Sequence, residues 1–324
     1  MKLPSLTVGV LNFNRSSEVR RTIAAILASD YPDDQLSIEL LDNASTDRSV
    51  DDVGDEFGNR VTIRRSGANI GPVYRNQLLC APQTEFIALF DDDCHPAETE
   101  TLSTAVAFLE SHPEFGALCF RSFNVPDGAF EFNHPGQIYC QKHDDGTFEG
   151  MYVIGGAMVF RASALHNIEG YDERLVFGGE EYDLALELLR NDIRIGMRPE
   201  LFIRHHQAPR AVSSLRSMQL DMRNNIWISI RRFPLPLVPI LLTLHTARRL
   251  IGAAKNRDGR RMRGYLRGIR AGLVGALPFL KTRRPVRYRQ LWHHRAWFRG
   301  MFVAGRPVDI ENPTTTPQES DGVS

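Results

Sequence analysis

The sequence has little cysteine and no long hydrophobic run. Its four cysteines, Cys80, Cys94, Cys119 and Cys140, match neither a CxxC pair nor a disulfide framework, so a reducing, cytoplasmic location is the simpler expectation. Residues 1–10 lack a charged segment followed by a long apolar one, and no signal peptide is predicted. The longest apolar stretch, residues 233–244, contains Pro234, Pro236 and Pro239. We expect it to be too short and too interrupted to span a membrane.

The net charge of the whole chain is zero, but its parts carry large opposite charges. Residues 1–209 hold 17 Lys and Arg against 33 Asp and Glu, a net charge of −16, whereas residues 210–306 hold 22 against 2, a net charge of +20. The remaining residues carry four acidic groups and no basic ones. We therefore predict an acidic domain at 1–210, a basic amphipathic helical region at 211–306 and a disordered tail at 307–324.

Short apolar runs alternate with helical patterns in the first hundred residues. Strands are expected at 7–11, 37–41, 61–64 and 85–90, and helices are expected from Ser16 or Ser17, from Asp47 and from Gly71. This alternation is the signature of βαβ units, so the predicted fold class is α/β, with a mostly parallel sheet flanked by helices. Ligands of such sheets gather at the carboxyl ends of the strands.

The second half of the acidic domain is less regular. A helix is expected from Pro96 to His112, a long loop at 124–150, an apolar segment at 152–160, a helix at about 180–190 and an apolar strand at 201–203. A loop of that length in a compact domain is often a binding element.

Three consecutive aspartates, Asp91, Asp92 and Asp93, follow the apolar run 86–90. Asp91 and Asp93 point the same way if the chain stays extended. Adjacent carboxylates repel one another unless a cation or hydrogen-bond donors neutralise them, and a divalent cation shared with phosphate oxygens would do so. The alternative is an acidic loop that caps a helix beginning near Pro96.

Several segments, in this order and at this spacing, resemble the family-2 glycosyltransferases. They are Val8 to Arg15 (VGVLNFNR), Glu39 to Asp47 (ELLDNASTD), Asn69 to Asn76 (NIGPVYRN) and the aspartates. The resemblance covers residues 5–210. It implies a GT-A fold, with a donor half at about 1–95 and an acceptor half at about 96–210. It also implies a metal-dependent, inverting transfer of a sugar from a nucleoside diphosphate.

The resemblance gives Asp42 a hydrogen bond to the nucleotide base, with backbone near Leu11 and Asn12 lining the base pocket. The alternative for Asp42 is a turn or cap formed with Ser45 and Asp47.

The resemblance also assigns the contacts to ribose, diphosphate and metal. Arg75 would approach the diphosphate or ribose, unless it is a solvated helix arginine. Asn69, Asp91 and Asp92 complete the expected donor contacts. Asp93, with Asp91, would bind the metal.

An acidic segment, Glu180-Glu181-Tyr182-Asp183, resembles the family's Glu-Asp-x-Asp-Leu motif at the start of a helix. Glu181 stands at the aspartate that serves as general base in the family and would accept the proton of the acceptor hydroxyl. Glutamate is one methylene longer than aspartate, so Glu180 and Asp183 are alternatives. The alternative is a structural role for these acidic residues, since negative charge in the first turn of a helix complements the helix dipole.

Two adjacent histidines, His205 and His206, follow an apolar strand where the family often places a histidine that completes the metal shell. Imidazole suits Mn²⁺ better than Mg²⁺, so the expected cofactor is a divalent cation, Mn²⁺ or Mg²⁺. Ordinary surface histidines are the alternative.

The expected partners are a nucleoside-diphosphate sugar, with UDP- and dTDP-sugars first, and a glycan, lipid-linked or small-molecule acceptor. In the basic region, arginine mixed with Leu, Ile, Trp and Phe favours an anionic membrane surface, at the inner face of the cell membrane. Pairing of these arginines with the acidic domain is the alternative. No base-reading motif appears, so nucleic acid is not expected as a partner.

Other functional classes have specific sequence requirements. The processive synthases of the family carry Gln-x-x-Arg-Trp, which Gln290 and residues 295–297 do not match, so a single addition is preferred. A sugar-nucleotide nucleotidyltransferase would need a Gly-rich phosphate loop where residues 12–15 read Asn-Phe-Asn-Arg. A non-catalytic membrane or nucleic-acid adaptor would use only the basic region and would leave the acidic motifs without a role.

Overall fold

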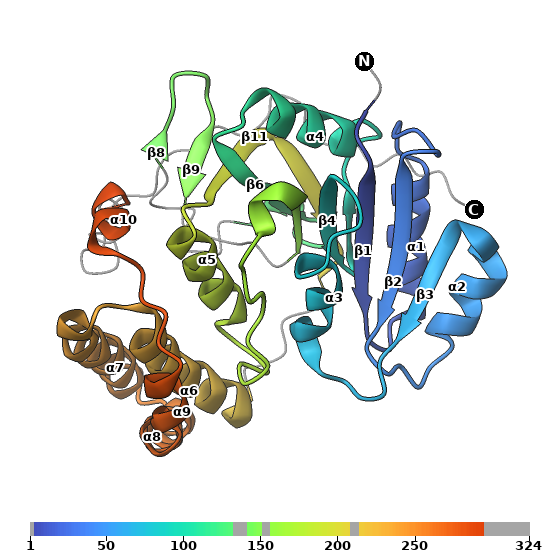
Figure 1. Ribbon diagram of the computed structural model, residues 1–324. Coiled ribbons are helices and arrows are strands. Elements are labelled where there is room, and N and C mark those ends of the chain that lie inside the picture. The colour runs from blue at the N-terminus through green and yellow to red at the C-terminus, as the bar shows by residue number, and fades with distance from the viewer. Residues whose placement is uncertain (1–2, 132–140, 151–155, 208–213, 295–324) are drawn as a thin grey trace.

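The computed structural model describes residues 3–131, 141–150, 156–207 and 214–294. Within them, strands form one sheet in the order β3-β2-β1-β4-β10-β6-β11-β9-β8, with β5 paired to β11 and β7 paired to β6 (Figure 1). The strands are β1 Leu6–Asn12, β2 Leu36–Asp42, β3 Val61–Arg65, β4 Phe86–Asp91, β5 Cys94–Pro96, β6 Phe115–Asn124, β7 Ala129–Phe130, β8 Gln141–Lys142, β9 Phe148–Gly150, β10 Ala157–Arg161 and β11 Arg194–His205.

The sheet is parallel through its first four strands and mixed beyond them. β1 lies between β2 and β4, and its register places Asn12 opposite Asp42 and Leu11 opposite Asp91. The carboxyl ends of these strands therefore meet at one edge. β10 runs antiparallel to both β4 and β6, whereas β11 runs parallel to β6. The predicted α/β class is confirmed, and its parallel character belongs to the first half.

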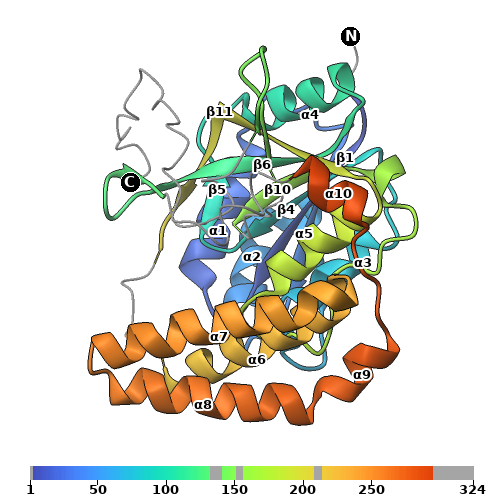
Figure 2. The ribbon, with the colours of Figure 1, turned by 90° about the vertical axis from the view of Figure 1, so that its left-hand side faces the viewer.

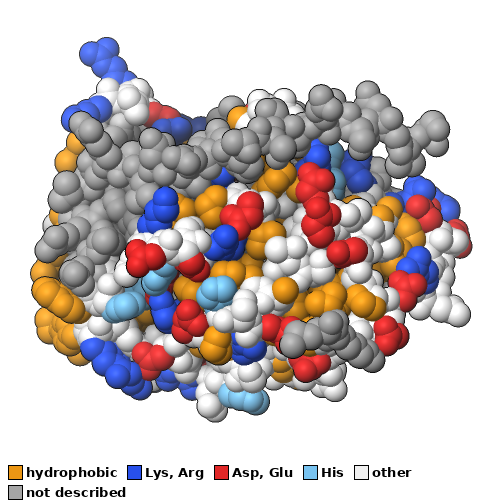
Figure 3. Space-filling model, turned by 90° about the horizontal axis from the view of Figure 1, so that it is seen from above, with side chains coloured by type: hydrophobic (Ala, Val, Ile, Leu, Met, Phe, Trp, Pro, Cys, Tyr) orange, Lys and Arg blue, Asp and Glu red, His pale blue; other side chains and the backbone are white. Residues whose placement is uncertain are grey.

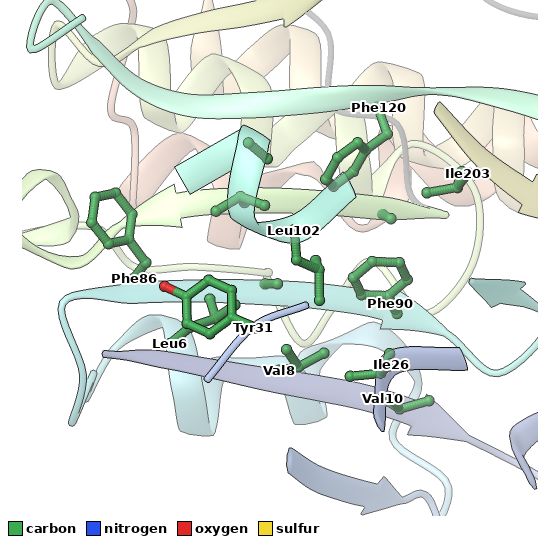
Figure 4. Packing of buried hydrophobic residues seen from close by; sticks show 14 of the residues in the cluster. Leu6, Val8, Val10, Ile26, Tyr31, Phe86, Phe90, Leu102, Phe120 and Ile203 are labelled. Carbon is green, nitrogen blue, oxygen red and sulfur yellow. The ribbon is translucent and has the colours of Figure 1, made fainter. Parts of the chain in front are cut away.

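Helices cover both faces of the sheet. The helices of the α/β domain are α1 Ser16–Leu27, α2 Ser49–Phe57, α3 Asn76–Leu79, α4 Thr101–Ser111 and α5 Glu180–Arg190. On one face, Ile26 of α1 and Leu102 of α4 pack with Val8 of β1 and Phe90 of β4 (Figure 4). On the other face, α3 and α5 bury leucines against the same strands. Burial of apolar side chains on both faces explains the nearly continuous apolar runs of β1 and β4.

Several expected elements have other bounds in the structure. The helix expected from Pro96 begins at Thr101, because residues 94–96 pair with β11 as β5. Gly71 opens a 3₁₀ turn, Gly71–Arg75, that leads into α3. The loop expected at 124–150 was wrong in part, since it contains β7, β8 and β9. Residues 152–155 and the tail expected at 307–324 lie outside the described residues.

The basic region folds into helices beside the α/β domain (Figures 1 and 2). They are α6 Leu215–Arg232, α7 Val238–Lys255, α8 Gly259–Val274, α9 Ala276–Lys281 and α10 Tyr288–His293. Glycines on one face of α8 allow it to pack closely on α6. A Cβ added to Gly268 would lie 2.6 Å from the Gln219 carbonyl oxygen, and one on Gly264 or Gly272 would meet a side chain at a similar distance. Close helix packing therefore accounts for this glycine repeat.

The apolar stretch expected at residues 233–244 is part of a longer helical segment in the structure. The helix continues to Lys255, and Pro239 sits in its first turn, where proline is tolerated. Residues 235–255 are long and apolar enough, by length and composition, to cross a membrane, with a mean hydropathy of 1.2 and only 17% of the most apolar window buried.

A buried ion cluster fixes α6 to the α/β domain. Arg232 of α6 has no exposed surface and donates to both oxygens of Asp183 at 2.7 and 2.6 Å, and it also pairs with Glu187. Both carboxylates lie on α5. The helix whose first turn was predicted to carry the general base is thus held in place by the basic region.

Candidate active site

A cavity of about 590 Å³ opens where the carboxyl ends of β1 and β4 meet. Seven predicted site residues line it: Leu11, Asn12, Asn69, Asp91, Asp92, Asp93 and His205. Its other lining residues are Phe13, Arg15, Asn43, Gly71, Phe177 and Gln207. The cavity therefore gathers residues from widely separated segments of the chain, as the strand register requires.

The aspartates face different partners within this cavity. Arg15 donates to Asp92 Oδ1 at 3.0 Å and pairs with Asp93, so its guanidinium lies across two of the three carboxylates. The Phe13 amide donates to Asp92 Oδ2 at 3.2 Å. Burial nevertheless raises the pKa of Asp92 to about 7. Hydrogen-bond donors and a cation thus offset the expected repulsion between the carboxylates.

A buried arginine, Arg75, fixes the position of Asp91. Arg75 is 2% exposed, pairs with Asp91 and donates to the Phe90 carbonyl oxygen at 3.2 Å. The interpretation of Arg75 as a solvated helix arginine was therefore wrong. Arg75 lies outside the lining of the cavity, where it orients Asp91.

His205 lies against Asp93, whereas His206 is turned away. His205 Nε2 is 3.5 Å from Asp93 Oδ1, and Nδ1 is 3.0 Å from Glu131 Oε2. Burial disfavours the charged imidazole, but hydrogen bonds and charges from Asp93 and Glu131 outweigh it and raise the pKa of His205 to about 10. His206 Nε2 instead lies 3.0 Å from His95 Nε2, with the two rings stacked.

Three ligand atoms, from Asp93, Cys94 and His205, lie within 4.8 Å of one another. Cys94 Sγ lies 3.7 Å from Asp93 Oδ1, but hard cations such as Mn²⁺ and Mg²⁺ prefer oxygen ligands to a soft thiol. A carboxylate and an imidazole remain, and Glu131 orients the imidazole from its other nitrogen. This arrangement is common behind metal-binding histidines and fits Mn²⁺ better than Mg²⁺.

Asp42 is fully buried beside the cavity and does not line it. Its oxygens accept hydrogen bonds from Asn12 Nδ2 at 3.3 Å and from the Ser45 amide at 3.2 Å. The structure therefore shows the turn with Ser45 that was one of its two expected roles. Contact of Asp42 with a nucleotide base stays a prediction.

The acidic residues at the start of α5 have distinct surroundings. Glu180 carries a buried oxygen, Oε2, that has no hydrogen-bond partner among the described residues, and burial raises the pKa of its carboxyl. Burial likewise raises the pKa of Tyr171 to about 12, with the charge of Glu181 contributing, so Glu181 lies close to Tyr171. Asp183 is 1% exposed with both oxygens on Arg232. Asp183 thus has a structural role, and we remove it from the candidates for the general base.

Some residues in and beside the cavity were not predicted as site residues from the sequence. Phe13, Arg15 and Asn43 lie inside the segments that carry the family resemblance, so the motifs pointed to their neighbourhood without assigning them roles. Glu131 and Gln207 lie in no motif. Glu131 follows β7 within the segment expected to be a loop, and only the pairing of β7 with β6 brings it to His205.

Comparison with known proteins decides the family. The model of a family described as glycosyltransferase-like family 2 matches residues 4–224, about two thirds of the chain. The chain belongs to this family. Family membership favours a glycosyltransferase over the nucleotidyltransferase and adaptor alternatives.

Curated relatives of this chain are distant and longer. It is 24% identical over 208 residues to a beta-monoglucosyldiacylglycerol synthase of Synechocystis sp., covering 60% of this chain and 42% of the relative. It is 25% identical over 260 residues to a probable glucomannan 4-beta-mannosyltransferase of Oryza sativa subsp. japonica, covering 70% and 47%. The chain thus spans less than half the length of these relatives.

Solved structures share the fold. The mannosyltransferase PcManGT from Pyrobaculum calidifontis, in complex with GDP-Man and Mn²⁺, superposes with a TM-score of 0.56 at 18% identity, over 93% of this chain and 88% of that one. S. aureus TarS 1–349 in complex with UDP-GlcNAc superposes with a TM-score of 0.58 at 15% identity, over 92% and 89%. The expected GT-A fold is confirmed.

Proposed function

We propose that this protein transfers a single sugar, with inversion, from a nucleoside-diphosphate sugar to an acceptor hydroxyl. The observation that carries the proposal is the cavity at the carboxyl ends of β1 and β4, which is lined by Asp93 and His205 together with Leu11 and Asn12. Residues 1–95 would hold the donor, and residues 96–210 would complete the acceptor side.

The donor's diphosphate would lie against the aspartates. Asp93 and His205 would hold Mn²⁺ or Mg²⁺, which when bound offsets the charge that develops on the departing diphosphate. Asp91, oriented by Arg75, and Asp92 would face the donor with Asn69. Arg15 is 40% exposed at the cavity, so its guanidinium is available to phosphate oxygens once a cation takes over Asp93.

The general base would come from the first turn of α5. Glu181 is favoured because it matches the family's catalytic aspartate. Glu180 is a second candidate, because its unpartnered buried oxygen and raised pKa suit proton acceptance. Either carboxylate would take the proton of the acceptor hydroxyl as that oxygen attacks the anomeric carbon opposite the diphosphate.

The acceptor would be a glycan, a lipid-linked molecule or a small molecule. The beta-monoglucosyldiacylglycerol synthase supports a lipid acceptor, and the glucomannan mannosyltransferase supports a glycan acceptor. UDP- and dTDP-sugars are the first donors to test, with GDP-mannose added because it is bound in a solved neighbour. A cytoplasmic location at the membrane surface would suit a lipid-linked acceptor.

The test is a donor screen that measures release of nucleoside diphosphate with Mn²⁺ and a panel of glycan, lipid and small-molecule acceptors present, so that the sugar has a hydroxyl to receive it. We expect release from at least one donor, and no release from any donor would refute the proposal. Glu181→Gln should retain donor binding and lose turnover by about 100-fold or more. If Glu180→Gln has that effect instead, Glu180 is the base, and normal turnover in both variants would remove the first turn of α5 from the mechanism.

A further inference from the structure

An exposed apolar surface runs along α7, α8 and α9. We define it by six residues, Ile240, Ile251, Leu266, Leu273, Val274 and Leu277, each more than half exposed and up to 80% for Val274. The two long helices lie side by side in front of α6 in Figure 2 and contact one another and α6. Exposed hydrophobic residues are more numerous on these helices than on the described part of the α/β domain, and such a concentration is typical of an interaction site.

The helices turn different faces to the domain and to solvent. Leu241 of α7 is 1% exposed, whereas its neighbour Ile240 is 52% exposed. On α8, the glycine face that includes Gly268 meets α6, while Leu266 and Leu273 lie on other sides of the helix. Among residues 214–294, the buried side chains of these helices therefore pack within the bundle, whereas about half or more of each apolar-surface side chain stays exposed.

The basic region contains two contrasting groups of arginines, besides those paired within the region itself. Arg231, Arg232 and Arg284 pair with carboxylates of the α/β domain. By contrast, Arg248, Arg257, Arg260, Arg267 and Arg270 are exposed on or beside α7 and α8 and pair with no carboxylate among the described residues. The expected pairing with the acidic domain is thus confirmed for the first group, and membrane contact of the second group stays a prediction.

No carboxylate is left to neutralise the second group. The basic region contains two acidic residues, Asp221 and Asp258. Asp221 accepts from Arg249 at 2.9 Å, and Asp258 pairs with Arg261 while capping α8. In contrast, acidic and basic side chains are interspersed over the face shown in Figure 3. The helices that carry the apolar surface therefore hold more arginines than their acidic groups neutralise, which complements an anionic layer.

We propose that this apolar surface with its unpaired arginines docks on an anionic lipid membrane. The helices lie in the plane of the interface, their apolar side chains enter the headgroup and acyl boundary, and the arginines reach the lipid phosphates. The inference does not depend on the proposed sugar transfer.

Docking in the plane fits the structure better than a membrane-spanning α7. Arg248 and Arg249 lie well inside the apolar segment 235–255, where charge is costly in hydrocarbon. Spanning would also remove Leu241 from the bundle and break the pair of Arg249 with Asp221. Bound protein should therefore be released by alkaline carbonate, which leaves spanning proteins in the membrane.

The experiment is flotation of the full chain with vesicles of phosphatidylcholine alone or mixed equally with phosphatidylglycerol. We expect binding to the anionic vesicles, weakened at high salt, and little binding to the neutral ones. Arg267→Gln/Arg270→Gln should lower partitioning by about fivefold for each charge removed. Leu273→Glu/Leu277→Glu should abolish it. Matched controls on the α/β domain, Arg60→Gln and Val176→Glu, should bind as the wild type does.

Each outcome decides the proposal. The proposal is overturned if the protein does not bind anionic vesicles, or if the folded helix variants bind them as the wild type does. It is also overturned if the protein forms a dimer in solution that buries the apolar surface and does not bind lipid. Circular dichroism melting shows whether each variant is folded. Calorimetry of the same samples with nucleotide sugars separates this result from the proposed function, since donor binding without vesicle binding refutes only the docking surface.

Discussion

Asp93 and His205 meet because β5 pairs with β11. The antiparallel register places Cys94 opposite His205, so the residue before Cys94 and the end of β11 are neighbours, and Nε2 of His205 lies 3.5 Å from Oδ1 of Asp93. His206, one residue further, points to His95 instead. The backbone pairing therefore selects one of two adjacent histidines for the cavity.

Substitution of His205 should weaken metal binding, whereas substitution of His206 should not. His205→Ala removes one of two proposed ligands and should weaken Mn²⁺ binding by at least about tenfold. His206→Ala is the matched control and should change it by less than about twofold. Calorimetric titration of metal-free protein with Mn²⁺ in the presence of a nucleoside diphosphate measures both. Equal losses in the two variants would contradict the assignment of His205.

Removal of Arg15 should strengthen metal binding in the absence of nucleotide. Arg15 neutralises Asp92 and Asp93, so a cation must compete with its guanidinium for Asp93. Arg15→Ala should raise Mn²⁺ affinity by a few-fold, because the competing charge is lost. Arg20→Ala, which breaks an exposed pair between Arg20 of α1 and Glu56 of α2, should leave it unchanged. Weaker Mn²⁺ binding by Arg15→Ala would show that Arg15 supports the metal site.

Much of this site could be predicted from sequence because its residues follow strands in order. The apolar runs before Asn12 and Asp91 fix where the parallel strands end, and parallel pairing brings those ends together. Glu131 could not be found this way, since its position depends on the two-residue strand β7 and its pairing with β6. Arg232, the partner of Asp183, could not be predicted either, because it lies on α6 in the basic region.

Loss of Arg232 should destabilise the protein strongly. Arg232→Met leaves Asp183 and Glu187 buried without their cation, which costs about 3–5 kcal/mol of unfolding free energy. Arg249→Ala breaks a partly exposed pair with Asp221 and should cost no more than about 1 kcal/mol. Urea unfolding followed by circular dichroism compares them. Similar losses from both variants would mean that the buried cluster contributes little.

Stability should fall in acid partly through Glu149. Burial disfavours its charge, but Arg194 and His143, whose Nε2 is 3.0 Å away, outweigh it and lower the pKa of Glu149 to about 2. A lowered carboxyl pKa contributes stability above its ordinary value, 4.5, and that contribution is lost as pH falls through 2. His293 and His294 also face this carboxylate, with their Nε2 atoms 3.4 and 4.0 Å from its Oε1.

Glu149→Gln tests this pH dependence. The variant should lose about 1–3 kcal/mol at neutral pH, and its difference from the wild type should shrink as the pH falls below the ordinary value of a glutamate carboxyl. Glu200→Gln, which breaks a surface pair with Arg198, is the control and should show a small loss. Urea unfolding at a series of pH values gives the comparison. A difference that grows toward acid would contradict the sign derived for Glu149.

The central claim is metal-dependent binding of a nucleotide sugar at the aspartates. The most direct measurement is calorimetric titration of the purified protein with UDP-, GDP- and dTDP-sugars, with and without Mn²⁺, for the wild type and Asp93→Ala. We predict that at least one donor binds the wild type with Mn²⁺, and that this binding is lost without Mn²⁺ and in Asp93→Ala. Donor binding that is unaffected by both changes, or no donor binding at all, would contradict it.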